Sequence, residues 1–111
     1  MPEPIIDPTI FADLQEAAGA EFVAELVGTF FEEAPVMLAE LRSAQAAQSA
    51  DAFRRAAHSL KSNGHTFGAT RLAAMARDLE LGGLVADTGP IDALDQEYQR
   101  AAVALKELCD G

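Results

Sequence analysis

The sequence predicts an all-α fold: an antiparallel four-helix bundle with a short additional helix at its N-terminus. Two observations predict it. Apolar residues recur at helical spacing along most of the chain, and no segment shows the alternation typical of a strand. Four amphipathic helices joined by short connections bury their apolar faces most simply as an antiparallel bundle. The length of 111 residues fits one domain.

The first two helices are predicted from their ends. Asp7 can cap a short helix, with Pro8 at its first position and Gly19 ending it. The residues expected on its buried side are Ile10, Leu14 and Ala17. A long helix follows over about residues 20–47, and Pro35 should kink it because proline removes a backbone hydrogen bond. The apolar stripe of this long helix is Val23, Val27, Phe30, Ala34, Met37, Leu38 and Leu41.

Three further helices complete the predicted bundle. Ser49 can cap a third helix that runs to about His65, and a Gly-Gly pair ends a fourth. A fifth starts at Pro90 and is capped by Thr88 or Gly89. The apolar stripes are Leu72, Met75, Ala76 and Leu79 in the fourth helix, and Ile91, Leu94, Tyr98, Ala102, Leu105 and Leu108 in the fifth.

Composition narrows the classes of function. The formal net charge of −10 argues against binding to nucleic acid, whose phosphates would be repelled. No apolar run approaches the length of about 18 residues that a membrane span needs, and the start "MPEPIIDP" lacks the basic and apolar regions of a signal peptide. The single cysteine, Cys109, can form no internal disulfide, which favours a reducing compartment. We therefore expect a cytoplasmic protein.

The charge is unevenly distributed. The window from Arg54 to Arg77 contains five basic residues and no acidic one, so it carries +5 and the rest of the chain carries −15. A basic face on an acidic body indicates a partner or group that is itself acidic. The alternative is that these charges simply keep two helix faces in contact with water.

His58 lies inside this basic window, on the exposed side of the third helix. When residues are projected at about 100° each, Leu60 falls at about 200° and Phe53 at about 220° from His58, so the apolar side is opposite. The residues that flank His58 on its own side are Arg54, Arg55, Lys61, Ser62 and His65. His58 is therefore expected to point into solvent rather than into the core.

An exposed imidazole among cations suits nucleophilic chemistry. A neutral ring keeps a lone pair on one nitrogen, and neighbouring cations would favour an anionic group placed on that nitrogen. General acid–base catalysis fits less well, because the sequence shows neither a polar group to orient the ring nor a pocket. A metal site fits poorly, because His58 and His65 are seven residues apart rather than four and no cysteine or acid lies nearby.

The segment "HSLK", which begins at His58, and the later Gly68-Ala69 resemble the signature of histidine-containing phosphotransfer (HPt) domains. The segments "FFEEAPVMLAEL" and "ATRLAAMARDLE" are also similar to the family's helices, so the likeness gives one HPt-like domain over residues 1–111 with its core at about 9–108. The resemblance implies that His58 is the phosphoacceptor and that Lys61 lies beside the phosphoryl group. It also implies that Ser62 is a position kept small for docking and that Gly68 ends the helix.

Two residues depart from the family pattern. Ser62 replaces the commonest residue there, glycine, and His65 stands where the family has Gly, Ala or Ser. On the docking face formed by Arg54, Arg55, Ser62 and His65, the extra imidazole could restrict partners or bind an incoming carboxylate. It could equally be a tolerated surface substitution.

The resemblance also implies a mechanism. The chain would pass a phosphoryl group between aspartates of receiver domains, acting as a phosphocarrier rather than an enzyme. The sequence has no phosphate-binding loop and no acidic cluster for Mg²⁺, so no cofactor is expected and the receivers would supply the metal ion. The implied partners are response-regulator receiver domains and a hybrid histidine kinase, and the chain is expected to be a monomer. The alternatives are an all-α interaction module in which His58 is not phosphorylated, and an HPt-related adaptor with a changed role.

Overall fold

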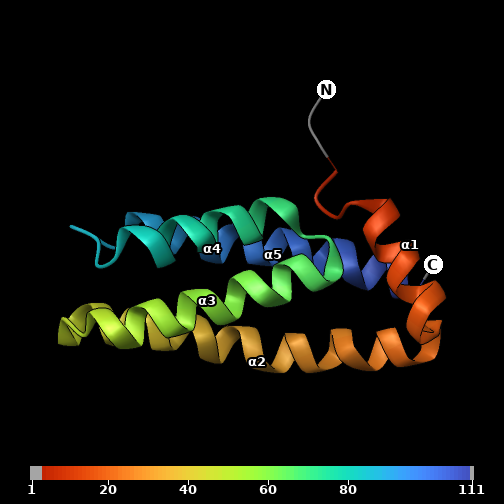
Figure 1. The fold of residues 1–111 in the computed structure, drawn as a ribbon, viewed down its shortest axis with the longest axis horizontal. Coiled ribbons are helices and arrows are strands. Elements are labelled where there is room, and N and C mark those ends of the chain that lie inside the picture. The colour runs from red at the N-terminus through yellow and green to blue at the C-terminus, as the bar shows by residue number, and fades with distance from the viewer. Residues whose placement is uncertain (1–3, 111) are drawn as a thin grey trace.

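A computed structural model describes residues 4–110, and these residues form five helices and no strand. The helices are α1 (Pro8–Ala18), α2 (Ala20–Ala47), α3 (Ala50–Phe67), α4 (Thr70–Gly82) and α5 (Gly89–Asp110). Helices α2 to α5 run antiparallel to their neighbours as a four-helix bundle, and α1 lies across the end where α2 begins (Figure 1). The predicted fold class is confirmed. None of the described helices is long and apolar enough to cross a bilayer.

The helix ends follow the capping residues. The Asp7 carboxylate accepts hydrogen bonds from the backbone N–H groups of Thr9 and Ile10, and the Ser49 hydroxyl accepts one from Ala52. At the other end of α3, Gly68 adopts the left-handed conformation that glycine tolerates best, with φ 82°. The bounds predicted for the helices are therefore close to the observed ones.

The buried side predicted for α1 is wrong. Phe11 is the buried residue of this helix, whereas Ile10 and Leu14 are half-buried and Ala17 is exposed. The physical reason is the position of α1 across the end of the bundle, where, of the described helices, it contacts α2 and α3 but not α4 or α5. A helix that covers an end in this way buries a narrow strip rather than a full amphipathic stripe.

The core of the bundle agrees better with the predicted stripes. In α2 the predicted stripe is buried except for the half-buried Met37, and Pro35 is exposed with helix on both sides of it. The kink expected at Pro35 stays a prediction. In α5, Ala101 is buried instead of Ala102, and Leu108 is exposed. The predicted α5 stripe therefore turns away from the core only after Leu105, in the last turn of the helix.

Polar contacts fix α2 against the C-terminal part of the chain. The Arg42 guanidinium contacts Asp92 at 2.8 Å and Asp95 at 3.3 Å, which joins α2 to α5. The Gln45 side chain bonds both backbone groups of Val85, in the loop between α4 and α5. These contacts hold α5 and the loop that follows α4 against α2, and the C-terminal turns of α4 carry part of the functional site.

Candidate functional site

His58 stands on the solvent side of α3. Its side chain is 55% exposed, while Phe53 and Leu60, on the opposite side of the helix, have no exposed surface. The backbone that carries the imidazole is therefore fixed by the core, and the ring itself is open to a partner. The orientation expected from helical periodicity is the one observed.

A carboxylate from another helix holds this ring. Glu80, in α4, places Oε2 2.7 Å from Nδ1 of His58. A carboxylate only accepts hydrogen bonds, so at this distance Nδ1 carries a proton and donates it. In the neutral ring the lone pair is then on Nε2, the nitrogen on the other side of the imidazole. The contact selects which nitrogen can act as a nucleophile.

Lys61 holds the other oxygen of the same carboxylate. Its Nζ lies 2.7 Å from Oε1 of Glu80, an atom with essentially no exposure to solvent. The Lys61 ammonium, followed by the His58 ring, lowers the pKa of Glu80 below its ordinary value of 4.5, while burial acts in the opposite direction. His58, Lys61 and Glu80 thus form one connected group in which Glu80 stays ionised at neutral pH.

Glu80 corrects two inferences drawn from the sequence. The sequence showed no polar group that could orient His58 and no acid nearby, and Glu80 is both. It lies 22 residues beyond His58, so no local motif joins the two. Their contact depends on the packing of α3 against α4. The clue available in the sequence was a pair of acids, Asp78 and Glu80, at the end of the basic window.

The close approach of α3 and α4 depends on a second glycine. Gly64 is buried, and a Cβ atom there would lie 3.1 Å from both Cβ and the backbone nitrogen of Ala73. Gly68 is similarly confined, because a Cβ atom would lie 3.1 Å from the Asp7 carbonyl oxygen and 3.1 Å from Cβ of Ile10. Gly68 was expected to have a structural role and Gly64 was not. Together they let α1 and α4 pack against the helix that bears His58.

The face around His58 carries less positive charge than the sequence indicated. Arg54 and Arg55 both contact the Asp51 carboxylate, at 2.8 and 3.2 Å, and the pair lowers the pKa of that carboxyl, Arg54 most. Asp51 and Glu80 lie just outside the window that has no acids. These acids partner three of the five basic residues of the window, so the cations expected around His58 are largely neutralised.

The remaining predicted residues lie on the same exposed face but apart from the connected group. Ser62 and His65 are exposed, and His65 is seven residues beyond His58, about 10.5 Å along the helix axis. A groove of about 520 Å³ lies between α2 and α3 and is lined by Arg55 and Ser59 among others. This groove and Glu80 are on opposite sides of His58. The exposed face of α3 therefore has a carboxylate on one flank and an open groove on the other.

Comparison with known proteins places this chain in a family. A sequence model of the Hpt domain matches residues 25–104. The crystal structure of histidine-containing phosphotransfer protein B (HptB) from Pseudomonas aeruginosa PAO1 is similar at a TM-score of 0.88 and 27% sequence identity, over 98% of this chain and 97% of that chain. No curated protein matches the sequence. The chain belongs to the Hpt domain family, and it is a phosphotransfer module of two-component signalling.

Proposed function

We propose that the chain is a phosphorelay intermediate, in which His58 accepts a phosphoryl group from a receiver-domain aspartate and passes it to the aspartate of another receiver. The observation that carries this proposal is the 2.7 Å contact between Glu80 and Nδ1 of His58, which leaves Nε2 of an exposed ring free. Membership in the Hpt family supports receiver domains as the partners, and one of them would belong to a hybrid histidine kinase.

The transfer step follows from the tautomer. The lone pair on Nε2 attacks phosphorus, the P–O bond to the receiver aspartate breaks, and its electron pair leaves with the aspartate carboxylate. The ring keeps its Nδ1 proton and becomes positively charged, and the Glu80 carboxylate faces that charge at 2.7 Å. Transfer to the second receiver is the same displacement in reverse, with a new aspartate oxygen attacking phosphorus and Nε2 leaving.

Lys61 supports this step through Glu80. Its ammonium neutralises one side of the carboxylate and fixes the direction in which Glu80 meets His58. Lys61 is also one turn of helix from His58, where its charge can interact with phosphoryl oxygens as the family resemblance implies. We therefore give Lys61 two roles, positioning Glu80 and stabilising the phosphoryl group.

The partner completes the reaction. The receiver would bring Mg²⁺ and most of the groups that stabilise the transition state, and this chain would bring the nucleophile and a surface to dock on. The docking surface is the exposed face of α3 with Arg54, Arg55, Ser62 and His65, together with the groove toward α2. We propose that the chain works as a cytoplasmic monomer and as a phosphocarrier rather than an enzyme.

The experiment that tests the proposal is phosphotransfer from a ³²P-labelled receiver to the full chain. We expect label that is lost in acid and retained in base, as for a phosphohistidine, and tandem mass spectrometry should place it on His58. The matched control is a His65→Gln variant, which should still take up label. If neither protein takes up label from a panel of receivers that keep their own, the chain is an interaction module without covalent chemistry.

A further inference from the structure

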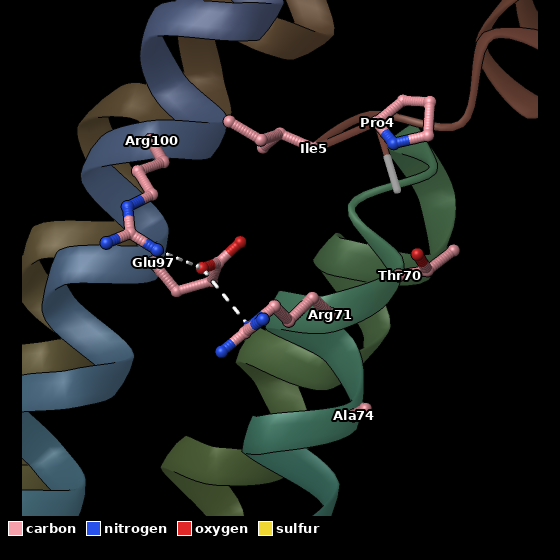
Figure 2. A pocket seen from close by; sticks show the side chains of 7 residues that line it. All are labelled: Pro4, Ile5, Thr70, Arg71, Ala74, Glu97 and Arg100. Carbon is pink, nitrogen blue, oxygen red and sulfur yellow. Dashed lines mark hydrogen bonds and ion pairs between the residues drawn. The ribbon is translucent and has the colours of Figure 1, made fainter. Parts of the chain in front are cut away.

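A second group of charged side chains lies in a cleft far from His58. The cleft has a volume of about 720 Å³ and opens between the N-terminal segment, the first turns of α4 and the middle of α5 (Figure 2). On α4, Arg71 of the cleft and Glu80 of the His58 site are nine residues apart, about 13 Å along the axis. The residues that line the cleft are Pro4, Ile5, Thr70, Arg71, Ala74, Glu97 and Arg100.

Glu97 forms the covered end of this cleft. It is 3% exposed, the sole charged residue among the buried residues of the described chain. Two arginines contact the same oxygen of Glu97: Arg71 Nε is 3.6 Å and Arg100 Nη1 is 3.4 Å from Oε1. These distances exceed the 2.7–2.9 Å or so of a strong charge-assisted hydrogen bond. Glu97 therefore holds the two arginines near each other, but it makes no strong hydrogen bond to either guanidinium.

The two arginines are free to bind something else. Their side chains are 72% and 59% exposed, and each guanidinium has five N–H donors of which Glu97 contacts one. Because both nitrogens contact the same oxygen, at 3.6 and 3.4 Å, they lie no more than about 7 Å apart. Two guanidiniums and one carboxylate give a local charge of +1 on a chain whose net charge is −10.

The walls beside these charges are apolar. Ile5 is exposed on one side of the cleft and Ala74 on the other, with Pro4 next to Ile5 (Figure 2). A bare ion would use the arginines and leave these side chains in water. A ligand with an apolar part would cover them as well, and burial of apolar surface adds to binding.

We propose that the cleft binds a small organic anion. Its carboxylate or phosphate group bridges Arg71 and Arg100, as planar guanidiniums favour, and its apolar part lies against Ile5 and Ala74. The site uses none of the residues that surround His58, so the inference stands apart from the proposed phosphorelay.

The test is a titration of the ¹⁵N-labelled full chain followed by NMR, with butyl phosphate, butyrate and inorganic phosphate as probes. We expect saturable shifts of the backbone amides of Thr70, Arg71, Ala74 and Arg100. Butyl phosphate or butyrate should bind at least about threefold more tightly than inorganic phosphate, because only they bury apolar surface. The tighter of the two organic probes identifies the anionic group that the cleft prefers.

Arg71→Ala and Arg100→Ala should each weaken binding by about fivefold or more. Arg77→Ala is the matched control, because it removes the same charge from the exposed surface of α4 outside the cleft and should leave the dissociation constant within about twofold. Circular dichroism checks that all three variants fold. Shifts that do not saturate, equal weakening in Arg77→Ala, or equal affinity for inorganic phosphate would each overturn the proposal and leave the three charges as a tether between α4 and α5.

Discussion

Glu80 and Glu97 are two covered carboxylates on neighbouring helices, and each contacts two basic side chains. Their geometry differs. Glu80 uses both oxygens, each at 2.7 Å from a different partner, whereas Glu97 shares one oxygen between two partners at 3.4 and 3.6 Å. The residues also differ in what they hold: Glu80 holds an imidazole and an ammonium, and Glu97 holds two guanidiniums.

The difference shows that the partner decides what a covered carboxylate can do. An imidazole can be fixed as one tautomer and still offer its second nitrogen for reaction. A guanidinium has donors alone and stays charged, so a carboxylate beside it can position charge but cannot create a nucleophile. If the chain works as proposed, the contacts of Glu80 would serve phosphoryl transfer, and we expect those of Glu97 to have no part in it.

The largest effect is expected from removing the imidazole of His58, the group that distinguishes the Glu80 site from the Glu97 site. His58→Gln should abolish uptake of the phosphoryl group, because glutamine can still contact Glu80 but has no nucleophilic nitrogen. The free energy of unfolding should change by less than about 0.5 kcal/mol, as is usual for an exposed side chain. Labelling by a phosphorylated receiver and chemical denaturation measure the two quantities. A variant that still takes up label, or that unfolds, would contradict the account.

The second effect comes from removing each carboxylate in turn. Glu80→Ala should slow phosphoryl uptake by roughly 10- to 100-fold, by analogy with metal-bound histidines that lose the carboxylate orienting the ring. Glu80→Gln keeps a hydrogen-bond acceptor but loses the charge, so its transfer rate should lie between the rates of Glu80→Ala and the wild type. Glu97→Ala is the matched control and should transfer within about twofold of the wild-type rate. Single-turnover transfer rates decide the comparison, and equal losses in Glu80→Ala and Glu97→Ala would remove the distinction between the sites.

A smaller effect is expected from substituting the basic residues that contact the two carboxylates. Lys61→Ala should slow transfer by several-fold, because Glu80 loses the contact that fixes it, and should shorten the lifetime of the phosphohistidine. Arg71→Ala removes the same charge from a partner of Glu97 and should change neither quantity. Lys61→Arg tests the reason, since it keeps the charge and should recover part of the rate. Unchanged rates in Lys61→Ala in both directions of transfer would exclude Lys61 from the site.

The ionisation of Glu80 predicts a dependence of stability on pH. Its pKa is lower in the folded chain than the ordinary value of 4.5, so its contribution to stability is complete above pH 4.5 and is lost as pH falls through the folded-state value. The difference in free energy of unfolding between wild type and Glu80→Gln should therefore shrink on acidification below pH 4.5. Denaturation series at several pH values measure this difference. If the difference in free energy of unfolding grows as the pH falls below 4.5, the predicted direction is wrong.

The smallest effect is expected at His65, on the docking face but outside the connected group. His65→Ala should leave phosphoryl uptake competent and change the rate for some receivers by a few-fold, because an interface side chain contributes about 1 kcal/mol in either direction. Comparing transfer rates of both proteins over a panel of receivers measures this. Equal rates throughout would make His65 a tolerated surface residue.

The helices could be predicted from the sequence because their boundaries are local. Asp7, Ser49 and Gly68 act on backbone groups within a few residues, and the stripes of α2 and α4 repeat over several turns. The exposed position of His58 follows from the same periodicity. The expectation for α1 failed because Phe11 is buried by the placement of one helix across others, which no periodicity within α1 contains.

Glu80 could not be predicted for a related reason. Its contact with His58 needs α3 and α4 in one particular register, and that register depends on the close packing of Gly64 against Ala73. A sequence shows each helix face but not which residues of two faces meet. Family resemblance supplied His58 and Lys61, and the carboxylate that joins them required the folded chain.

We propose above all that Glu80 fixes His58 so that Nε2 is the reactive nitrogen. Long-range ¹H–¹⁵N NMR of the histidine rings tests it directly, in the free chain and after phosphorylation by a receiver. We predict that neutral His58 carries its proton on Nδ1 and that the phosphoryl group forms its bond to Nε2. We also predict that the free Glu80→Ala variant populates both tautomers. A proton on Nε2 in the free chain, or a phosphoryl group on Nδ1, would contradict the proposal.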